Sequence, residues 1–142
     1  MRRVIPANKV NHDYEKVLSE FVSALKNRLG EYLLMVYLTG SYARGDANDN
    51  SDLDVFCIFS TINQYVLENV GHCARNTSIP YDLLEINTQC LSVDEYKSKI
   101  FEDWSEYAIA ELNSVLLYGE QLVKIENINE KIQLSYKKNL AN

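Results

Sequence analysis

Basic side chains are outnumbered in this chain of 142 residues. Fourteen Lys and Arg stand against 20 Asp and Glu, which gives a formal net charge of −6. No basic stripe is visible, and pairs such as Lys137-Lys138 are short. A protein that grips a polynucleotide backbone normally carries a basic patch, because its Lys and Arg side chains must neutralise phosphates. We therefore expect no nucleic-acid partner, and the charge disfavours a template-using polymerase.

Cysteine is scarce, and long apolar runs are absent. The three cysteines, Cys57, Cys73 and Cys90, are odd in number, far apart and without a C-x-x-C pairing. This usage is typical of reduced, mostly packed thiols. The N-terminal Arg2-Arg3 pair is not followed by the apolar segment of a secretion signal, and no run reaches the length of a membrane span. These absences predict a cytoplasmic protein with no membrane partner.

The chain also lacks repeats, low-complexity segments and linkers. With 142 residues, 46% of them hydrophobic, it is long enough to bury one core and too short for two. We therefore predict a single domain over 1–142, with a core at about 13–119 and a C-terminal helical tail at about 120–142.

Apolar periodicity predicts alternating helices and strands. Gly30 stands where a C-cap glycine belongs, and Ser92 with Glu95 forms a capping box. Helices are expected at 13–29, at 62–74 with a break toward its end at Gly71, from Ser92 to about 101, and at 104–118 up to Gly119. A short helical turn is expected near 42–46, strands at 32–39, 52–59 and 79–86, and a weakly amphipathic tail at 127–140. The pattern predicts an α+β fold in which helices pack on a small mixed β-sheet.

Two acids stand at the start of the second predicted strand. Gly40-Ser41 follows the first strand, ten residues intervene, and Asp52-Leu53-Asp54 opens the next apolar run. Residues two apart on a strand share a face, so the carboxylates of Asp52 and Asp54 lie side by side. Adjacent carboxylates repel unless a cation or a proton relieves them. Mg²⁺ takes oxygen ligands, commonly one or two carboxylates together with substrate phosphates, so the pair indicates a metal site.

Two other motifs begin in the same stretch but are incomplete. The glycine spacing of a P-loop is present, but the Lys and Ser/Thr that should follow Gly45 are replaced by Asp46 and Ala47. A calcium-binding EF-hand loop would need Gly where Ser51 stands and a bidentate Glu where Cys57 stands. The polar residues of the loop are therefore interpreted as ordinary turn formers: Asp46, Asn48, Asp49 and Asn50.

The spacing of Gly40-Ser41 and Asp52-Leu53-Asp54 resembles the motif of the nucleotidyltransferases related to DNA polymerase beta, and most closely the small ones called minimal nucleotidyltransferases. The motif covers residues 40–54. A looser likeness extends from near residue 13 to residues 115–119, which are similar to the family's closing helix. The resemblance implies a polymerase beta-like nucleotidyltransferase fold. It also implies an Mg²⁺-dependent enzyme that moves a nucleoside monophosphate, expected to be AMP from ATP, onto a hydroxyl.

The resemblance also implies roles for individual residues. The triphosphate would be bound by Gly40, Ser41 and Arg44, although Arg44 is as readily interpreted as a solvated side chain. Asp52 and Asp54 would hold two Mg²⁺ ions. A third carboxylate is expected on the strand predicted at 79–86, where Asp82 and Glu85 differ in parity and face opposite sides. We favour Asp82, as a metal ligand or as the proton acceptor.

The acceptor is left open between a protein and a small molecule. Small family members act as antitoxins that adenylylate a HEPN-type toxin, whereas relatives with an extra helical domain modify aminoglycosides. Only about fifty residues follow the third predicted strand, which favours a protein partner or a site completed by a homodimer. The alternative from another functional class is a nucleotide-binding or partner-binding module without turnover. The intact Gly40, Ser41, Asp52 and Asp54 argue against it.

Overall fold

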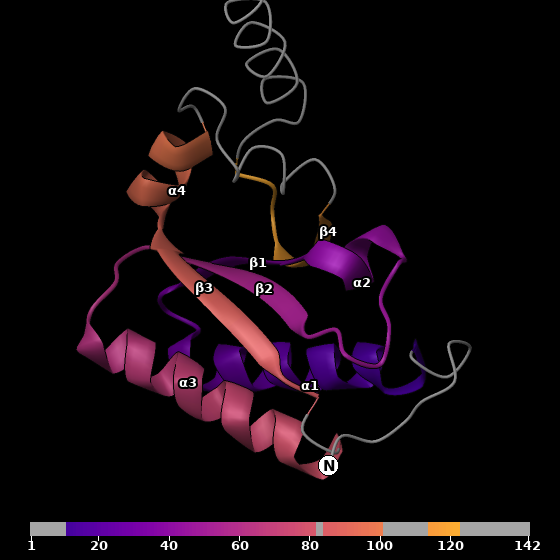
Figure 1. Cartoon of the computed structure of the whole chain (residues 1–142). Coiled ribbons are helices and arrows are strands. Elements are labelled where there is room, and N and C mark those ends of the chain that lie inside the picture. Colours follow the sequence, from indigo (N-terminus) through magenta and orange to yellow (C-terminus); the bar gives the residue numbers. More distant parts are fainter. Residues whose placement is uncertain (1–10, 82–83, 101–113, 123–142) are drawn as a thin grey trace, which may run out of the picture.

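A four-stranded sheet forms the centre of the computed structural model, which describes residues 11–81, 84–100 and 114–122 (Figure 1). The strands are β1 (Leu33–Thr39), β2 (Leu53–Phe59), β3 (Ile86–Ser92) and β4 (Val115–Gly119). The helices are α1 (Asn11–Leu29), α2 (Gly40–Arg44), α3 (Gln64–Ser78) and α4 (Val93–Ile100), with a short 3-10 helix, η2, at Ile79–Tyr81. The sheet has the order β3-β2-β1-β4.

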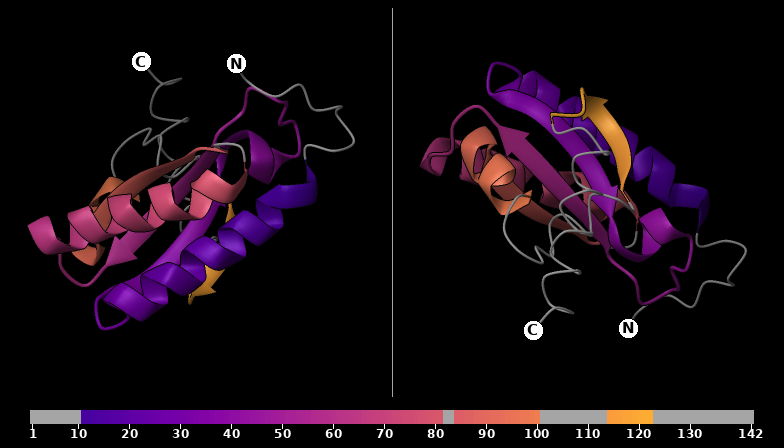
Figure 2. Two further views of the ribbon diagram at one scale, coloured as in Figure 1. Left: turned by 90° about the horizontal axis from the view of Figure 1, so that it is seen from below. Right: turned by 90° about the horizontal axis from the view of Figure 1, so that it is seen from above.

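The sheet is mixed, as the sequence predicts. Strand β1 runs antiparallel to both β2 and β4, whereas β2 and β3 are parallel. Helix α3 connects β2 to β3, as a parallel pair requires a crossover. Helices α1 and α3 cover one face of the sheet, and α4 lies on the other (Figures 1 and 2). The predicted α+β fold of a small mixed sheet packed with helices is confirmed.

Alternation along β2 divides the core into two layers. Leu53, Val55 and Cys57 belong to the cluster beneath α1 and α3. Phe56 and Ile58 belong to a second cluster with Tyr96 and Ile100 of α4. Asp54 has the parity of Phe56, so it lies on the α4 face of the sheet, away from the two long helices.

The third strand does not lie at 79–86, where we predicted it. Residues 79–81 form η2, and β3 begins only at Ile86. Helix α3 also continues through Gly71 to Ser78, so the predicted break is wrong. Two features explain the error: Pro80 favours a turn over a strand interior, and β3 is an edge strand in which one of its seven residues, Leu91, is buried.

The predicted helix at 104–118 is wrong at its C-terminal end. Residues Val115–Gly119 form β4, which pairs with β1, and residues 101–113 lie outside the described part of the chain. A short apolar run cannot be assigned to helix or strand by periodicity alone. The register of β4 shifts between its partners Val36 and Tyr37, so that Leu117 and Tyr118 both pack on the α1/α3 cluster, as a bulge allows. The predicted tail at 127–140 also lies outside the described residues.

The capping box at the start of α4 is confirmed. Ser92 Oγ accepts from the backbone N–H of Glu95 at 3.1 Å, and Glu95 Oε1 accepts from the N–H of Ser92 at 3.2 Å. This reciprocal pair satisfies two amides that the first helical turn leaves without partners. Within the parts of the chain that the structure describes, we find no helix long and apolar enough to cross a membrane.

Candidate active site

The chain turns sharply where β1 meets α2. Gly40 has a φ of +74°, a conformation that residues with a side chain rarely adopt. Helix α2 is only five residues long and ends at Gly45, which has a φ of +85°. The backbone N–H of Gly45 donates to the carbonyl of Ser41 at 2.9 Å. Two left-handed glycines therefore fix the beginning and the end of this short helix.

Gly40 also lies directly against Asp54. A β-carbon built at position 40 would overlap Oδ2 of Asp54 and would come within 3.3 Å of its β-carbon. The preceding residue, Thr39, is the register partner of Asp54 across the antiparallel pair, and the Thr39 hydroxyl donates to the Asp54 carbonyl at 3.5 Å. The Gly-Ser turn and the second acid are thus held together by the β1–β2 pairing.

The two acids flank a buried residue and are themselves partly exposed. Leu53 is 0% exposed, whereas Asp52 and Asp54 both keep some contact with solvent. Oδ2 of Asp52 accepts from Nδ2 of Asn87 at 3.2 Å. Asn87 is in turn the register partner of Asp54 on the parallel strand β3. Asn87 is therefore associated with both acids, through a side-chain hydrogen bond to one and strand pairing with the other.

Asn87 is a residue of the candidate site that the sequence did not predict. A third side chain beside the two acids was expected within residues 79–86, and Asn87 lies just outside that range. Once β3 is placed at 86–92, alternation puts Asn87 on the face of Phe56 and Asp54. Of the two predicted third acids, Glu85 is exposed and precedes β3, where its backbone carbonyl accepts from the N–H of Leu53 at 2.8 Å. Asp82 lies outside the described residues.

The donor set at this end of the sheet consists of hard oxygen atoms. Asp52 and Asp54 contribute two carboxylates, which suits Mg²⁺ when substrate phosphates supply further ligands. Among the described residues, no three His, Cys, Asp or Glu side chains gather closely enough to hold a metal ion. The pair therefore fits a metal that is bound jointly by the protein and a substrate.

The loop between α2 and β2 is held by its own polar side chains. Oδ1 of Asn48 accepts from the N–H of Asn50 at 2.8 Å, and Oγ of Ser51 accepts from the N–H of Asn48 at 2.9 Å. These bonds confirm the predicted turn role of Asn48. Arg44 is exposed, and its Nε lies 3.4 Å from Oδ2 of Asp46, so in this structure the guanidinium pairs within the loop.

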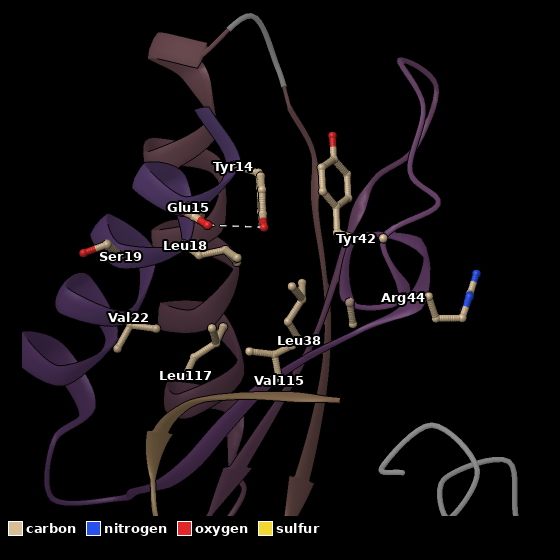
Figure 3. A pocket seen from close by; sticks show the side chains of 12 residues that line it. Tyr14, Glu15, Leu18, Ser19, Val22, Leu38, Tyr42, Arg44, Val115 and Leu117 are labelled. Atoms are coloured by element: carbon tan, nitrogen blue, oxygen red, sulfur yellow. Dashed lines mark hydrogen bonds between the residues drawn. The ribbon is translucent and has the colours of Figure 1, made fainter. Parts of the chain in front are cut away.

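A separate pocket lies on the other side of α2. It has a volume of about 610 Å³ and is lined by parts of α1, α2 and β4. Figure 3 shows the ring of Tyr14 from α1 beside the ring of Tyr42 from α2, with Leu38 and Val115 near each other below them, while Arg44 points away from these side chains. The two tyrosine rings have centroids 5.0 Å apart. Neither Asp52 nor Asp54 lines this pocket, so it is distinct from the acid pair.

This chain resembles known proteins in both sequence and fold. The model of the nucleotidyltransferase domain family matches residues 18–136. A protein of Methanocaldococcus jannaschii named "Putative protein adenylyltransferase" is 39% identical over 54 residues, which are 38% of this chain and 54% of that protein. The chain therefore spans about half the length of this curated relative.

Two solved structures share the arrangement of helices and strands to different degrees. The first, described as a "putative nucleotidyltransferase" from Sulfolobus solfataricus, has a TM-score of 0.55 and 21% identity, covering 87% of this chain and 99% of that one. The second, a toxin-antitoxin structure with AMP-PNP, has a TM-score of 0.48 and 14% identity over 87% of each chain. Only the first is close enough to support the fold. Because the family model spans most of the sequence, including the Gly-Ser turn and the acid pair, the chain belongs to the nucleotidyltransferase domain family.

Proposed function

We propose that this protein is an Mg²⁺-dependent adenylyltransferase that moves AMP from ATP onto a hydroxyl of a protein. The observation that carries the proposal is the contact between Gly40 and the carboxylate of Asp54. It sets a glycine turn, which a phosphate chain can approach closely, beside an acid suited to a hard cation. Membership of the nucleotidyltransferase family supports the reaction class.

The triphosphate would be bound at the Gly40-Ser41 turn. The Thr39 side chain does not cap α2, because its hydroxyl is directed to the carbonyl of Asp54. The backbone amides at the turn and the Ser41 hydroxyl would then bind an anion, as successive amides do in anion-binding turns. Arg44 would add a cation if its guanidinium exchanged Asp46 for a phosphate. That exchange costs little because the Arg44–Asp46 pair is exposed.

Asp52, Asp54 and Asp82 would hold two Mg²⁺ ions. When bound, the metal supplies charge neutralisation at the phosphates and acidifies the attacking hydroxyl. Asn87 would hold the carboxylate of Asp52 in place through its 3.2 Å hydrogen bond, since partners behind a metal ligand fix its orientation. If Asp82 does not bind a metal ion, we assign it the alternative role of accepting the proton of the attacking hydroxyl.

The reaction is then an in-line displacement at the α-phosphorus. The acceptor oxygen forms a bond to that phosphorus, and the bond to the oxygen bridging to the β-phosphorus breaks. Pyrophosphate leaves, and the acceptor proton passes to the base. The chain contributes mainly positioning and charge compensation, which supply most of the catalysis in phosphoryl chemistry.

A protein acceptor is the substrate class that the observations favour. The name of the Methanocaldococcus jannaschii relative specifies a protein substrate. The net charge of −6 disfavours nucleic acid and suits a partner with complementary positive charge. A HEPN-type partner, as the family resemblance implies, or a second copy of the chain that completes the site, is consistent with this assignment.

The test uses ATP labelled in two positions. The full chain is incubated with Mg²⁺ and lysate from its own source, in parallel with ATP labelled at the α- or the γ-phosphate. We expect one or a few proteins to acquire the α-label, none to acquire the γ-label, and chelation of the metal to abolish labelling. Transfer of the γ-label would indicate a kinase. Tight nucleotide binding without any transfer would instead favour the binding-module hypothesis.

A further inference from the structure

Two cysteines face each other across the parallel strands that carry the site. Cys57 of β2 and Cys90 of β3 are register partners. Both lie on the face of the sheet that α1 and α3 cover, where Cys57 is 0% exposed and Cys90 is only partly buried. The strand pairing thus places a buried thiol beside one that solvent can reach.

The two thiols are joined by a hydrogen bond, and they differ in acidity. The hydrogen bond to Cys90 raises the pKa of the Cys57 thiol well above its ordinary value, and burial adds to the effect. The same bond lowers the pKa of the Cys90 thiol, although burial opposes it. Cys57 therefore keeps its proton and donates it, while Cys90 has the greater thiolate character. Thiolate character together with exposure determines which cysteine is oxidised first.

The third cysteine differs from this pair in its position. Cys73 lies on α3 and is 2% exposed. Burial raises the pKa of its thiol, although the nearby Arg28 opposes this. A buried, protonated thiol reacts slowly with a peroxide from solution, and Cys73, unlike Cys57, has no register partner that could become a sulfenic acid beside it. Cys73 therefore provides an internal comparison for the reactivity of Cys90.

We propose that Cys57 and Cys90 form a reversible disulfide when the protein meets a hydroperoxide. In the first step the Cys90 thiolate attacks the peroxide, takes one oxygen to become a sulfenic acid and, with one proton, releases water from hydrogen peroxide. In the second step the Cys57 sulfur attacks the Cys90 sulfur, the S–O bond breaks and a second water leaves with the Cys57 proton. The two thiols are oxidised by two electrons, and the peroxide is reduced by two.

The cross-link would join the two strands that carry the candidate active site. Asp54 lies three residues before Cys57, Asn87 lies three residues before Cys90, and these two are register partners as well. Neighbouring strands lie about 4.8 Å apart, which is within the range of about 4.4–6.8 Å that separates the α-carbons of a disulfide. Closing the bond therefore ties β2 to β3 beside the acid pair without changing their spacing, and we expect the linked protein to keep its activity. This consequence rests on the proposed function, whereas the disulfide itself does not.

The experiment follows the thiols by mass and the transfer reaction separately. The full reduced chain is treated with hydrogen peroxide, alkylated and digested without reduction. We expect a peptide in which Cys57 is linked to Cys90, an alkylated Cys73, and an intact mass lower by about 2 Da before alkylation. A dithiol added before alkylation should reverse the link and the mass change. Cys90→Ser should abolish the link, whereas Cys73→Ser should retain it. Mg²⁺-dependent transfer should stay within about twofold of the reduced protein in the linked wild type, because the bond fits the native strand spacing.

Several outcomes would overturn the proposal. A link that includes Cys73, or oxidation of Cys90 to sulfinic acid without any link, would show that the pair does not close. A quantitative link that abolishes transfer until the protein is reduced would contradict the expectation that the bond fits the native strand spacing. If the reduced wild type transfers no nucleotide at all, the proposed function fails, while the mass measurement still decides whether the disulfide forms.

Discussion

The α-carbon of Gly40 lies so close to the carboxylate of Asp54 that no β-carbon fits between them. The two residues stand at opposite ends of the loop that joins β1 to β2, and strand pairing brings them together. Any side chain at position 40 would displace the acid. Substitution of this glycine should therefore affect the candidate metal site as well as the backbone.

Two glycine substitutions separate backbone strain from damage to the site. Gly40→Ala and Gly45→Ala both place a side chain at a positive φ, +74° and +85° respectively, which costs about 1–2 kcal/mol of stability in each case. A β-carbon at position 45 meets nothing within 4 Å, whereas one at position 40 meets Asp54. Both variants should melt at lower temperature, but only Gly40→Ala should lose most of its transfer rate per folded molecule. Equal losses of activity would contradict the site.

Asp54→Asn should remove Mg²⁺-dependent transfer by at least about a hundredfold, because the neutral amide is a weaker ligand for the cation. The melting temperature should stay unchanged or rise slightly, since repulsion between Asp52 and Asp54 disappears. Asp49→Asn is the matched control from the neighbouring loop and should keep full activity. Transfer rates with labelled ATP test the expected loss of activity, and thermal melting curves test the expected stability. An active Asp54→Asn variant would exclude this residue as a metal ligand.

Asn87→Ala removes the hydrogen bond to Asp52. Loss of a group that orients a metal ligand typically costs about 10–100-fold in metal affinity or activity, so the Mg²⁺ concentration needed for half-maximal transfer should rise. Gln89→Ala is the control, because Gln89 is exposed and has the same parity on β3. A magnesium titration of both variants provides the measurement. A defect of equal size in both would indicate a general effect on the strand.

The third acid can be identified by comparing two substitutions. Asp82→Ala should reduce transfer by orders of magnitude, as expected for a metal ligand or a base. Glu85→Ala should cost little, because the Glu85 side chain is exposed and its interaction with β2 uses the backbone carbonyl. Turnover numbers at saturating ATP and Mg²⁺ test both variants. The opposite result would assign the third position to Glu85.

The parts of the site that are local in sequence could be predicted from it. The position of the Gly-Ser turn after the first strand, the start of the second strand beside the acids, and the turn role of Asn48 all depend on residues within one hairpin. Period-two alternation and turn chemistry are sufficient there. The long helix α1 was also predicted, because its apolar residues recur at helical spacing, which is likewise a local pattern.

The parts that depend on distant pairing could not be predicted. Strand β3 is mostly polar because it forms an edge, so its sequence lacks the apolar run that marks a strand. The run 115–119 is apolar but too short to reveal whether it forms a helix or a strand. Asn87 is important only because the parallel register sets it opposite Asp54. That register joins two strands that α3 separates in the sequence, so no local pattern reveals it.

The hairpin that carries the turn and the acids also determines the order in which the site can assemble. The hydrogen bond between Thr39 and Asp54 spans 15 residues of chain, whereas the one between Asp52 and Asn87 spans 35 and needs the α3 crossover. Shorter loops close at a smaller entropic cost and earlier in folding. A nascent chain leaving the ribosome would therefore bring the Gly-Ser turn and Asp54 together first. The side-chain amide of Asn87, which donates a hydrogen bond to Asp52, would reach the site only after α3 had been synthesised and had packed on the sheet.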